Sequence, residues 1–307
     1  MANETKPSSL KARFRVVHLD AGREMRGGQW QALALHEGLL ARGERSLLLA
    51  REESPLAKAA RERALPMEPL SLGRVWREGR DAILHAHDAA SHRMAAIAGA
   101  RRLVVSRRVV FPVKRGFLSR WKYRRAALFL AVSEQVRGEL LRAGVPMERI
   151  RVVYDGVEAL PLPRERRDVV ALDSDDPGKC GDLIRVAASL GGFPVSFHGD
   201  LPSAFAQAKI FVYLSRAEGL GSAALLAMSA GIPVVASRLP ALAEIVEHRK
   251  TGLLVDNEAA AVAEAVRTLL SDDSLCESLG QAGRDAVEAR FSVDHMVENT
   301  LAAYQSL

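Results

Sequence analysis

The sequence predicts an α/β protein made of two doubly wound parallel-sheet domains. Short apolar runs rich in β-branched residues alternate with segments of helical periodicity, which is typical of parallel sheets covered by helices. The alternation pauses once, at the Pro-rich stretch EALPLPRERRD (158–168). The 307 residues also exceed one ordinary α/β unit. Because ligands bind such sheets at the carboxyl ends of the strands, the motifs at those ends are the candidate sites.

Six strands and three helices are predicted before the pause. The apolar runs lie at 14–19, 46–50, 82–86, 103–106, 128–132 and 151–154. Helical spacing covers 29–43, 90–99 and 134–143. Gly43 and Gly144 are candidate helix stops, and Ser133 is a candidate N-cap.

Five strands and several helices are predicted after the Pro-rich stretch 158–168. The strands are expected at 169–172, 195–198, 210–214, 233–237 and 252–255. The helices are expected at 181–190, 258–271, 274–290 and 293–305, with a further small-residue helical pattern after Glu218. We therefore expect an N-terminal Rossmann-like domain over 1–157 and a C-terminal one over 158–291, with a last helix (292–307) packing back on the first domain.

Composition excludes several classes of protein. Apolar residues make up 48% and charged residues 26%, as in a globular chain. The two cysteines predict neither a disulfide framework nor a zinc site, and favour a reducing cytoplasm. The start, MANETKPSSLKARF, lacks the apolar core of a signal peptide, and no apolar run approaches the length of a membrane-spanning helix.

Charge is distributed unevenly along the chain. Residues 1–150 carry 29 Lys and Arg against 15 Asp and Glu, whereas residues 151–307 carry 14 against 22. Residues 101–125 hold ten Lys and Arg and no acid. Such a stretch is typical of a surface that meets an anionic partner.

Several stretches resemble the GT-B glycosyltransferases of the retaining group 4 family. The strongest match is 195–256, which contains RAEGLGSAALLAMSAGIPVVAS; MRGGQW, AILHAHDAASH, LVVSRRVVFP and FLAVSEQVRGELLRAGVPMERIRVVYDGVE also match. The resemblance implies two Rossmann-like domains facing a cleft. It also implies an enzyme that moves a sugar from a nucleotide diphosphate to an acceptor hydroxyl in the synthesis of cell-surface glycans or lipopolysaccharide-type glycolipids.

The donor-binding candidates follow two strands of the second domain. The resemblance assigns Glu218 to the hydroxyls of the donor sugar and as a catalytic residue, while a helix-capping role is the alternative. Backbone N–H groups at the helix start can meet phosphate or sugar oxygens. The candidates for these contacts are Gly219, Leu220, Gly221 and Ser222. Lys179 matches a diphosphate-binding lysine, with a solvated surface lysine as the alternative.

The first domain supplies further candidates. Gly27 and Gly28 are expected in a loop that approaches donor phosphate or acceptor closely, the alternative being an ordinary turn. His85, His87 and Asp88 could orient an acceptor hydroxyl, with His87 the candidate base; packed or solvated histidines are the alternative, which His92 fits best. Arg107 and Arg108 are candidate anion-binding residues. Arginine stays protonated, so Arg108 cannot be a base.

Three departures from the family pattern favour an alternative. Leu226 stands where a second glutamate would hold the ribose, Asp173 stands where an arginine is expected, and Cys180 replaces a glycine. Asp175 and Asp176 add negative charge there. The interval after Asp182 also lacks room for one β/α unit. The alternative is thus a catalytically impaired scaffold in a glycan-assembly complex, and a partner chain could complete the reduced domain.

The stretch FPVKRGFLSRWKYRR mixes aromatic and basic residues. This composition is typical of helices on anionic membranes, which suits a protein peripheral to the inner face of the cytoplasmic membrane. A solvated basic face and RNA binding are the alternatives, the latter resting on this stretch alone. No metal-ligand cluster is evident, so we expect neither a metal nor a cofactor beyond the nucleotide-sugar substrate.

Overall fold

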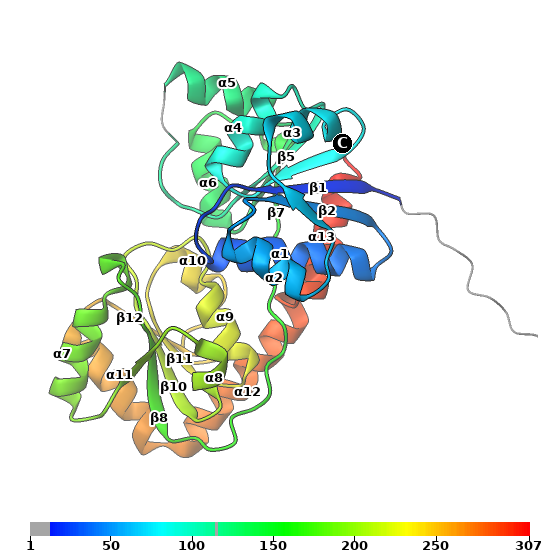
Figure 1. Ribbon diagram of the computed structural model, residues 1–307. Helices are drawn as coiled ribbons and strands as arrows, with labels where there is room; N and C mark the ends of the chain where they lie inside the picture. The colour runs from blue at the N-terminus through cyan, green and yellow to red at the C-terminus, as the bar shows by residue number, and fades with distance from the viewer. Residues whose placement is uncertain (1–12, 114–115) are drawn as a thin grey trace, which may run out of the picture. The chain divides into compact units, whose positions relative to one another are not determined.

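The structure is a computed structural model that describes residues 13–113 and 116–307 (Figure 1). The expectation of no signal peptide falls almost entirely on residues outside the described part. Lys114 and Arg115 of the basic stretch also lie outside it.

The predicted α/β class is confirmed, because the described strands form two parallel sheets. The first sheet has seven strands in the order β3-β2-β1-β4-β5-β6-β7. Its strands are β1 (Arg15–Asp20), β2 (Arg45–Ala50), β3 (Met67–Pro69), β4 (Ile83–Ala86), β5 (Arg102–Arg107), β6 (Leu128–Ala131) and β7 (Ile150–Val152). All except β3 were predicted. This strand has three residues and ends in proline, so it carries no apolar run.

One α-helix lies between each pair of consecutive strands of the first sheet. These helices are α1 (Gly27–Ala41), α2 (Pro55–Glu62), α3 (Leu72–Glu78), α4 (Ala89–Ile97), α5 (Phe117–Arg125) and α6 (Glu134–Arg142), with the short helix η1 (Met147–Arg149). The predicted cap at Ser133 is confirmed, since its Oγ accepts a hydrogen bond of 3.1 Å from Val136 N. Gly43 and Gly144 follow helix ends with φ of +78° and +81°, a conformation that favours glycine.

The second sheet has five strands in the order β12-β11-β10-β8-β9. Its strands are β8 (Asp168–Leu172), β9 (Ser196–His198), β10 (Ala208–Tyr213), β11 (Val234–Ser237) and β12 (Leu253–Val255). Its helices are η2 (Pro177–Lys179), α7 (Gly181–Gly191), α8 (Leu201–Phe205), α9 (Ser222–Ser229), α10 (Pro240–Ala243), α11 (Ala259–Ser271), α12 (Asp273–Arg290) and α13 (Val293–Tyr304). This sheet is the smaller one, and α7 alone fills the interval between Cys180 and Phe193, as the short spacing predicts.

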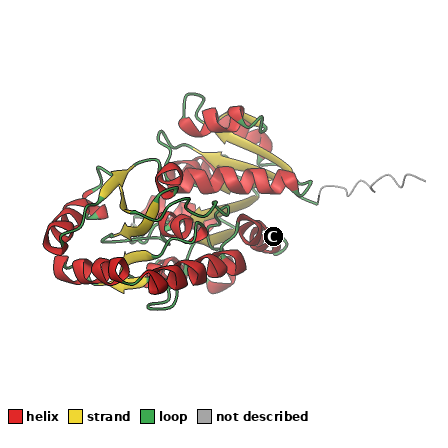
Figure 2. Ribbon diagram, turned by 90° about the horizontal axis from the view of Figure 1, so that it is seen from below, coloured by secondary structure: helices red, strands yellow, loops and turns green. Residues whose placement is uncertain are grey.

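Strand alternation assigns the two faces of the second sheet. Val169 and Ala171 of β8, with Ile210 and Val212 of β10, join one buried cluster with residues of α7 and α11. Tyr213 therefore belongs to the opposite face, where its ring stacks on Phe211 with centroids 5.7 Å apart. Helices cover both faces, with α7 and α11 on one side and α9 and α12 on the other (Figure 1). Figure 2 shows the helices in red and the strands in yellow, seen from below.

The described residues fall into two compact units. The first unit comprises residues 13–106, 116–129 and 307, and the second comprises 107–113 and 130–306. Within the second unit, Val157 N donates a 2.9 Å hydrogen bond to Phe291 O beside α13. The domain boundary predicted at 157/158 stays a prediction. No helix in the described ranges combines the length and the hydropathy needed to cross a bilayer.

His36 links α1 to β2 and to the residue that precedes β3. Its ring nitrogens hydrogen bond to Ser46 Oγ at 2.6 Å and to Pro66 O at 3.1 Å. Burial is the main cause that lowers the pKa of His36 from 6.5 to about 4. The folded protein therefore holds this imidazole neutral at a pH where the unfolded chain protonates it.

We predict that this histidine makes the fold sensitive to acid. Between pH 6.5 and about 4 the unfolded state binds a proton that the folded state rejects, so stability falls as pH falls through this window. The loss approaches about 3 kcal/mol, by the conversion of a pKa shift to free energy. Urea unfolding at a series of pH values measures it. His36→Gln keeps a hydrogen-bonding side chain without the titration and should flatten the slope; an unchanged slope would contradict the assignment.

Candidate functional site

The carboxyl ends of β8 and β10 bring together two predicted donor-binding residues. Lys179 ends the short helix η2 after β8, and Glu218 lies in the loop after β10. Lys179 Nζ forms an ion pair with Glu218 Oε1. The side chains are 23% and 10% exposed, so the pair is shielded but reachable from solvent. The structure thus joins residues 39 positions apart in a single cluster.

Tyr213, which sequence reasoning did not assign, completes this cluster. Its hydroxyl donates to Glu218 Oε1 at 2.8 Å and accepts from Lys179 Nζ at 2.9 Å. Burial first, and then the charge and hydrogen bond of Glu218, raise the pKa of Tyr213 well above its usual value of 10. The phenol therefore stays neutral and donates. The run IFVYL (210–214) is typical of a core strand, and the tyrosine before its last residue was the available signal.

The glycines of the Glu218 loop are required by the fold itself. A Cβ at Gly219 would overlap the carbonyl oxygen of Arg108. Gly221 has φ of +106°, and a Cβ there would lie 2.5 Å from Leu242 Cδ2. Leu220 is buried, so only its backbone can serve a ligand. These packing demands explain the two glycines whether or not a ligand binds here.

Ser222 and Arg108 share a carboxylate that was not singled out from the sequence. Asp155, which is buried after β7, accepts from Arg108 Nε at 2.9 Å and from Ser222 Oγ at 3.3 Å. This pairing offsets the charge of the Arg108 guanidinium. The Arg107 guanidinium donates to the carbonyl of Phe111. Both predicted anion-binding arginines therefore also make hydrogen bonds within the protein.

The predicted histidines lie in a buried group in the first unit. His85 Nε2 is 2.8 Å from Ser106 Oγ, and His87 Nε2 is 2.8 Å from His18 Nδ1, a residue the sequence analysis did not assign. Rings of neighbouring histidines are 4.2 to 5.5 Å apart. His92 is also buried, within 3.1 Å of Lys122 O. The alternative of solvated histidines is therefore wrong, because His85, His87 and His92 are all buried.

The loop expected at Gly27 and Gly28 is wrong, and Asp88 has a local role in the fold. Gly27 and Gly28 do not form a loop, because they are the first two residues of α1. The tight position is Gly22, whose N–H donates to Asp20 Oδ1 at 2.7 Å. Asp88 serves as the N-cap of α4 and accepts from Ala90 N at 2.7 Å as well as from Ala21 N at 2.6 Å.

The same histidines are the group that could hold a metal among the described residues. One ligand atom from each of His18, His85 and His87 lies within 4.8 Å of the others. The 2.8 Å separation between His18 and His87 is a hydrogen bond, however, and is shorter than the roughly 3.3 Å that tetrahedral zinc imposes on two nitrogens. The group belongs to the first unit, whereas Lys179 and Glu218 belong to the second.

The residues that depart from the family pattern have the following local environments. Asp173 N donates to His198 O at 3.0 Å, and Asp176 caps η2 by accepting from Gly178 N at 2.8 Å. Cys180 has φ of +53°, the left-handed conformation that favours the glycine expected there. Leu226 lies half-buried on α9. It offers no side-chain acceptor.

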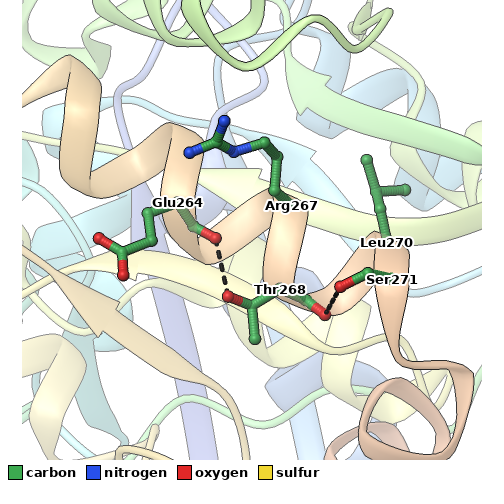
Figure 3. Close-up of a pocket in the computed structure, with 5 residues that line it drawn as sticks. All are labelled: Glu264, Arg267, Thr268, Leu270 and Ser271. Carbon is green, nitrogen blue, oxygen red and sulfur yellow. Dashed lines mark hydrogen bonds between the residues drawn. The ribbon is translucent and has the colours of Figure 1, made fainter.

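A cavity of about 490 Å³ lies elsewhere, along α11 (Figure 3). It is lined by Glu264, Arg267, Thr268, Leu270 and Ser271. The hydroxyls of Thr268 and Ser271 donate to backbone carbonyls of the same helix. None of the predicted site residues lines this cavity, so it adds nothing to the cluster at Lys179.

We predict that the Glu218 loop tolerates no side chain at position 219. Gly219→Ala forces its methyl group against the Arg108 carbonyl and should lower the free energy of unfolding by about 1–3 kcal/mol, the usual effect of overpacking. Gly199→Ala is the matched control, because its Cβ would meet nothing within 4 Å; we expect a change below about 0.5 kcal/mol. Equal denaturation midpoints for the two variants would contradict the close packing.

Two family models match the chain. The model for glycosyl transferases group 1 matches residues 193–286, and the model for Glycosyltransferase Family 4 matches residues 25–159. A GDP-mannose-dependent alpha-(1-6)-phosphatidylinositol monomannoside mannosyltransferase of Mycobacterium tuberculosis is 37% identical over 162 residues, covering 48% of this chain and 41% of the relative. O-antigen chain mannosyltransferase B of Escherichia coli is 38% identical over 109 residues, or 35% and 28%. The matched part thus spans less than half the length of these curated relatives.

Solved structures agree on the fold. The crystal structure of Anabaena HepE in complex with UDP and glucose superposes with a TM-score of 0.83 at 20% identity, covering 96% of this chain and 100% of that chain. Sucrose-phosphate synthase from Thermosynechococcus elongatus gives 0.72 at 16% identity, with 95% and 98% covered. With two parallel α/β sheets and a family model matching each half, the chain belongs to the GT-B glycosyltransferases.

Proposed function

We propose that the protein transfers a sugar from a nucleotide-diphosphate sugar to an acceptor hydroxyl, with retention at the sugar carbon. The meeting of Lys179 and Glu218 at the ends of β8 and β10 carries this proposal. One group is a cation suited to phosphate oxygens, and the other is an acceptor suited to sugar hydroxyls. A nucleotide-diphosphate sugar carries phosphate oxygens and sugar hydroxyls next to each other.

Each residue of this cluster has a role in the proposed reaction. When the diphosphate departs, negative charge builds on its oxygens and positive charge on the sugar carbon. Lys179 and the backbone N–H groups at the start of α9 stabilise the diphosphate, and Glu218 holds the sugar hydroxyls. Tyr213 fixes the position of the Glu218 carboxylate. Because these groups supply the stabilisation, the proposed reaction has no metal requirement.

The acceptor side of the proposal rests on the first unit. We assign His87 to the acceptor hydroxyl, with the 2.8 Å hydrogen bond to His18 fixing the orientation of its ring. His85 and Asp88 support this position through Ser106 and through the start of α4. Arg107 and Arg108, which belong to the second unit, remain the proposed anion-binding residues, although Asp155 offsets the charge of Arg108.

The acceptor is proposed to be a growing cell-surface glycan or glycolipid. Supporting this, the curated relatives include enzymes named for phosphatidylinositol monomannoside and for O-antigen chains. We propose that the protein acts in the cytoplasm, at the inner face of the cytoplasmic membrane, with the basic stretch 101–125 toward anionic lipid. A partner chain that completes the smaller second domain is also part of the proposal.

A turnover assay tests the proposed reaction. A panel of nucleotide sugars is incubated with the protein, and release of the nucleoside diphosphate is followed, including slow hydrolysis without acceptor. Glu218→Gln should lower turnover at least about a hundredfold, since each hydrogen bond to a charged group contributes about 1.5–3 kcal/mol. Glu264→Gln, an exposed change on α11, is the matched control and should leave turnover unchanged.

The same assay decides between the alternatives. We expect turnover to persist in the presence of EDTA, because no metal takes part in the proposed stabilisation. Turnover that survives Glu218→Gln would contradict the assigned role. If no donor in the panel turned over, the catalytically impaired scaffold would replace the transferase proposal.

A further inference from the structure

Helix α5 exposes apolar side chains to an unusual degree. Phe117 is 83% exposed and Leu118 is 76% exposed, and no residue of α5 is buried. These are the two highest exposures among the large hydrophobic residues of the described chain. Burying such side chains is favourable, so two adjacent ones left in water indicate a surface that meets a partner.

The helix is nevertheless firmly attached to the first unit. Tyr123 stacks on Phe129 of β6 with ring centroids 5.1 Å apart and an interplanar angle of 20°. The Tyr123 ring also lies 5.3 Å from that of His92, and His92 Nε2 is 3.1 Å from the carbonyl of Lys122. α5 packs beside α4 (Figure 1). It therefore presents a fixed face, and the ring contacts of Tyr123 mark its inward side.

Helical geometry defines what the outward side carries. At about 100° per residue, Phe117, Leu118, Trp121 and Arg125 fall within one arc of about 100°, opposite Tyr123. The Arg125 guanidinium lies over the Trp121 ring, 5.7 Å from its centroid.

Arginines border this apolar arc along one edge. By the same geometry Arg120 and Arg124 fall on that edge, whereas the Lys122 ammonium faces inward and donates to Ala89 O at 3.4 Å. Residues 101–125 contain no acid that would offset them. Apolar side chains flanked by cations match the layering of an anionic bilayer, in which acyl chains lie beneath negative headgroups.

We infer that the outward face of α5 docks on anionic phospholipid, with Phe117, Leu118 and Trp121 entering the interface and the flanking cations contacting the headgroups. The inference rests on the proposed membrane location, but it requires no sugar transfer. Vesicle binding is measured without donor or acceptor, so its failure and a failure of the transferase assay can be told apart.

The test uses vesicles of phosphatidylcholine and phosphatidylglycerol in equal parts, with phosphatidylcholine alone as the neutral arm. The full chain should sediment with the acidic vesicles at low salt and much less with the neutral ones. Phe117→Ser with Leu118→Ser should weaken this binding by about tenfold or more, since two large apolar side chains no longer enter the interface. Both side chains are exposed, so the fold should keep its melting temperature.

The chain offers a matched control on α3. Leu72 and Trp76 are 48% and 53% exposed, on another helix of the first unit that also carries arginines. Leu72→Ser with Trp76→Ser should leave vesicle binding unchanged. In a Trp30→Phe, Trp76→Phe background, Trp121 is the sole tryptophan, and its emission should shift to the blue on acidic vesicles.

Three results would overturn the inference. One is the absence of binding to acidic vesicles at low salt. Another is an equal loss of binding in the α5 and α3 double variants, which would place the contact elsewhere. The third is salt-sensitive binding of single-stranded RNA without binding of vesicles, which would assign the α5 face to nucleic acid.

Discussion

The parallel pairing of β8 with β10 is the constraint on which the proposed donor site depends. Val169, Val170 and Ala171 lie opposite Ile210, Phe211 and Val212 in the ladder, and both strands end within one residue of this register. Parallel strands end at the same edge of their sheet, so the segments that follow them emerge side by side. Lys179 and Glu218 meet because each lies a few residues beyond such an end.

The ion pair at this edge also explains how the site can stay intact without a ligand. A shielded charge with no partner costs free energy. Here the Lys179 ammonium and the Glu218 carboxylate are each other's partner, and the Tyr213 hydroxyl hydrogen bonds to both. A nucleotide sugar would offer replacements of the same kind, namely phosphate oxygens for Lys179 and hydroxyl donors for Glu218. In the proposed exchange each charged group keeps a partner, so ligand entry would leave neither charge uncompensated.

Much of the fold could be predicted from local pattern, whereas the site could be predicted only in part. The buried strands are continuous apolar runs, which locate them within one or two residues. β3 could not be located in this way because Met67–Pro69 has no such run. Glu218 and Lys179 carried recognisable motifs. Tyr213 and Asp155 did not, because their importance comes from partners far away in the sequence. The role of Gly219 likewise depends on the Arg108 carbonyl, which no local pattern reveals.

We propose that Lys179 and Glu218 exchange each other for a nucleotide-sugar donor. A crystal structure of the protein with a bound nucleotide sugar tests this most directly. We expect Lys179 Nζ to contact the diphosphate and Glu218 to accept hydrogen bonds from hydroxyls of the sugar, while Tyr213 still donates to Glu218. A donor bound elsewhere, with the Lys179–Glu218 ion pair unchanged, would contradict it.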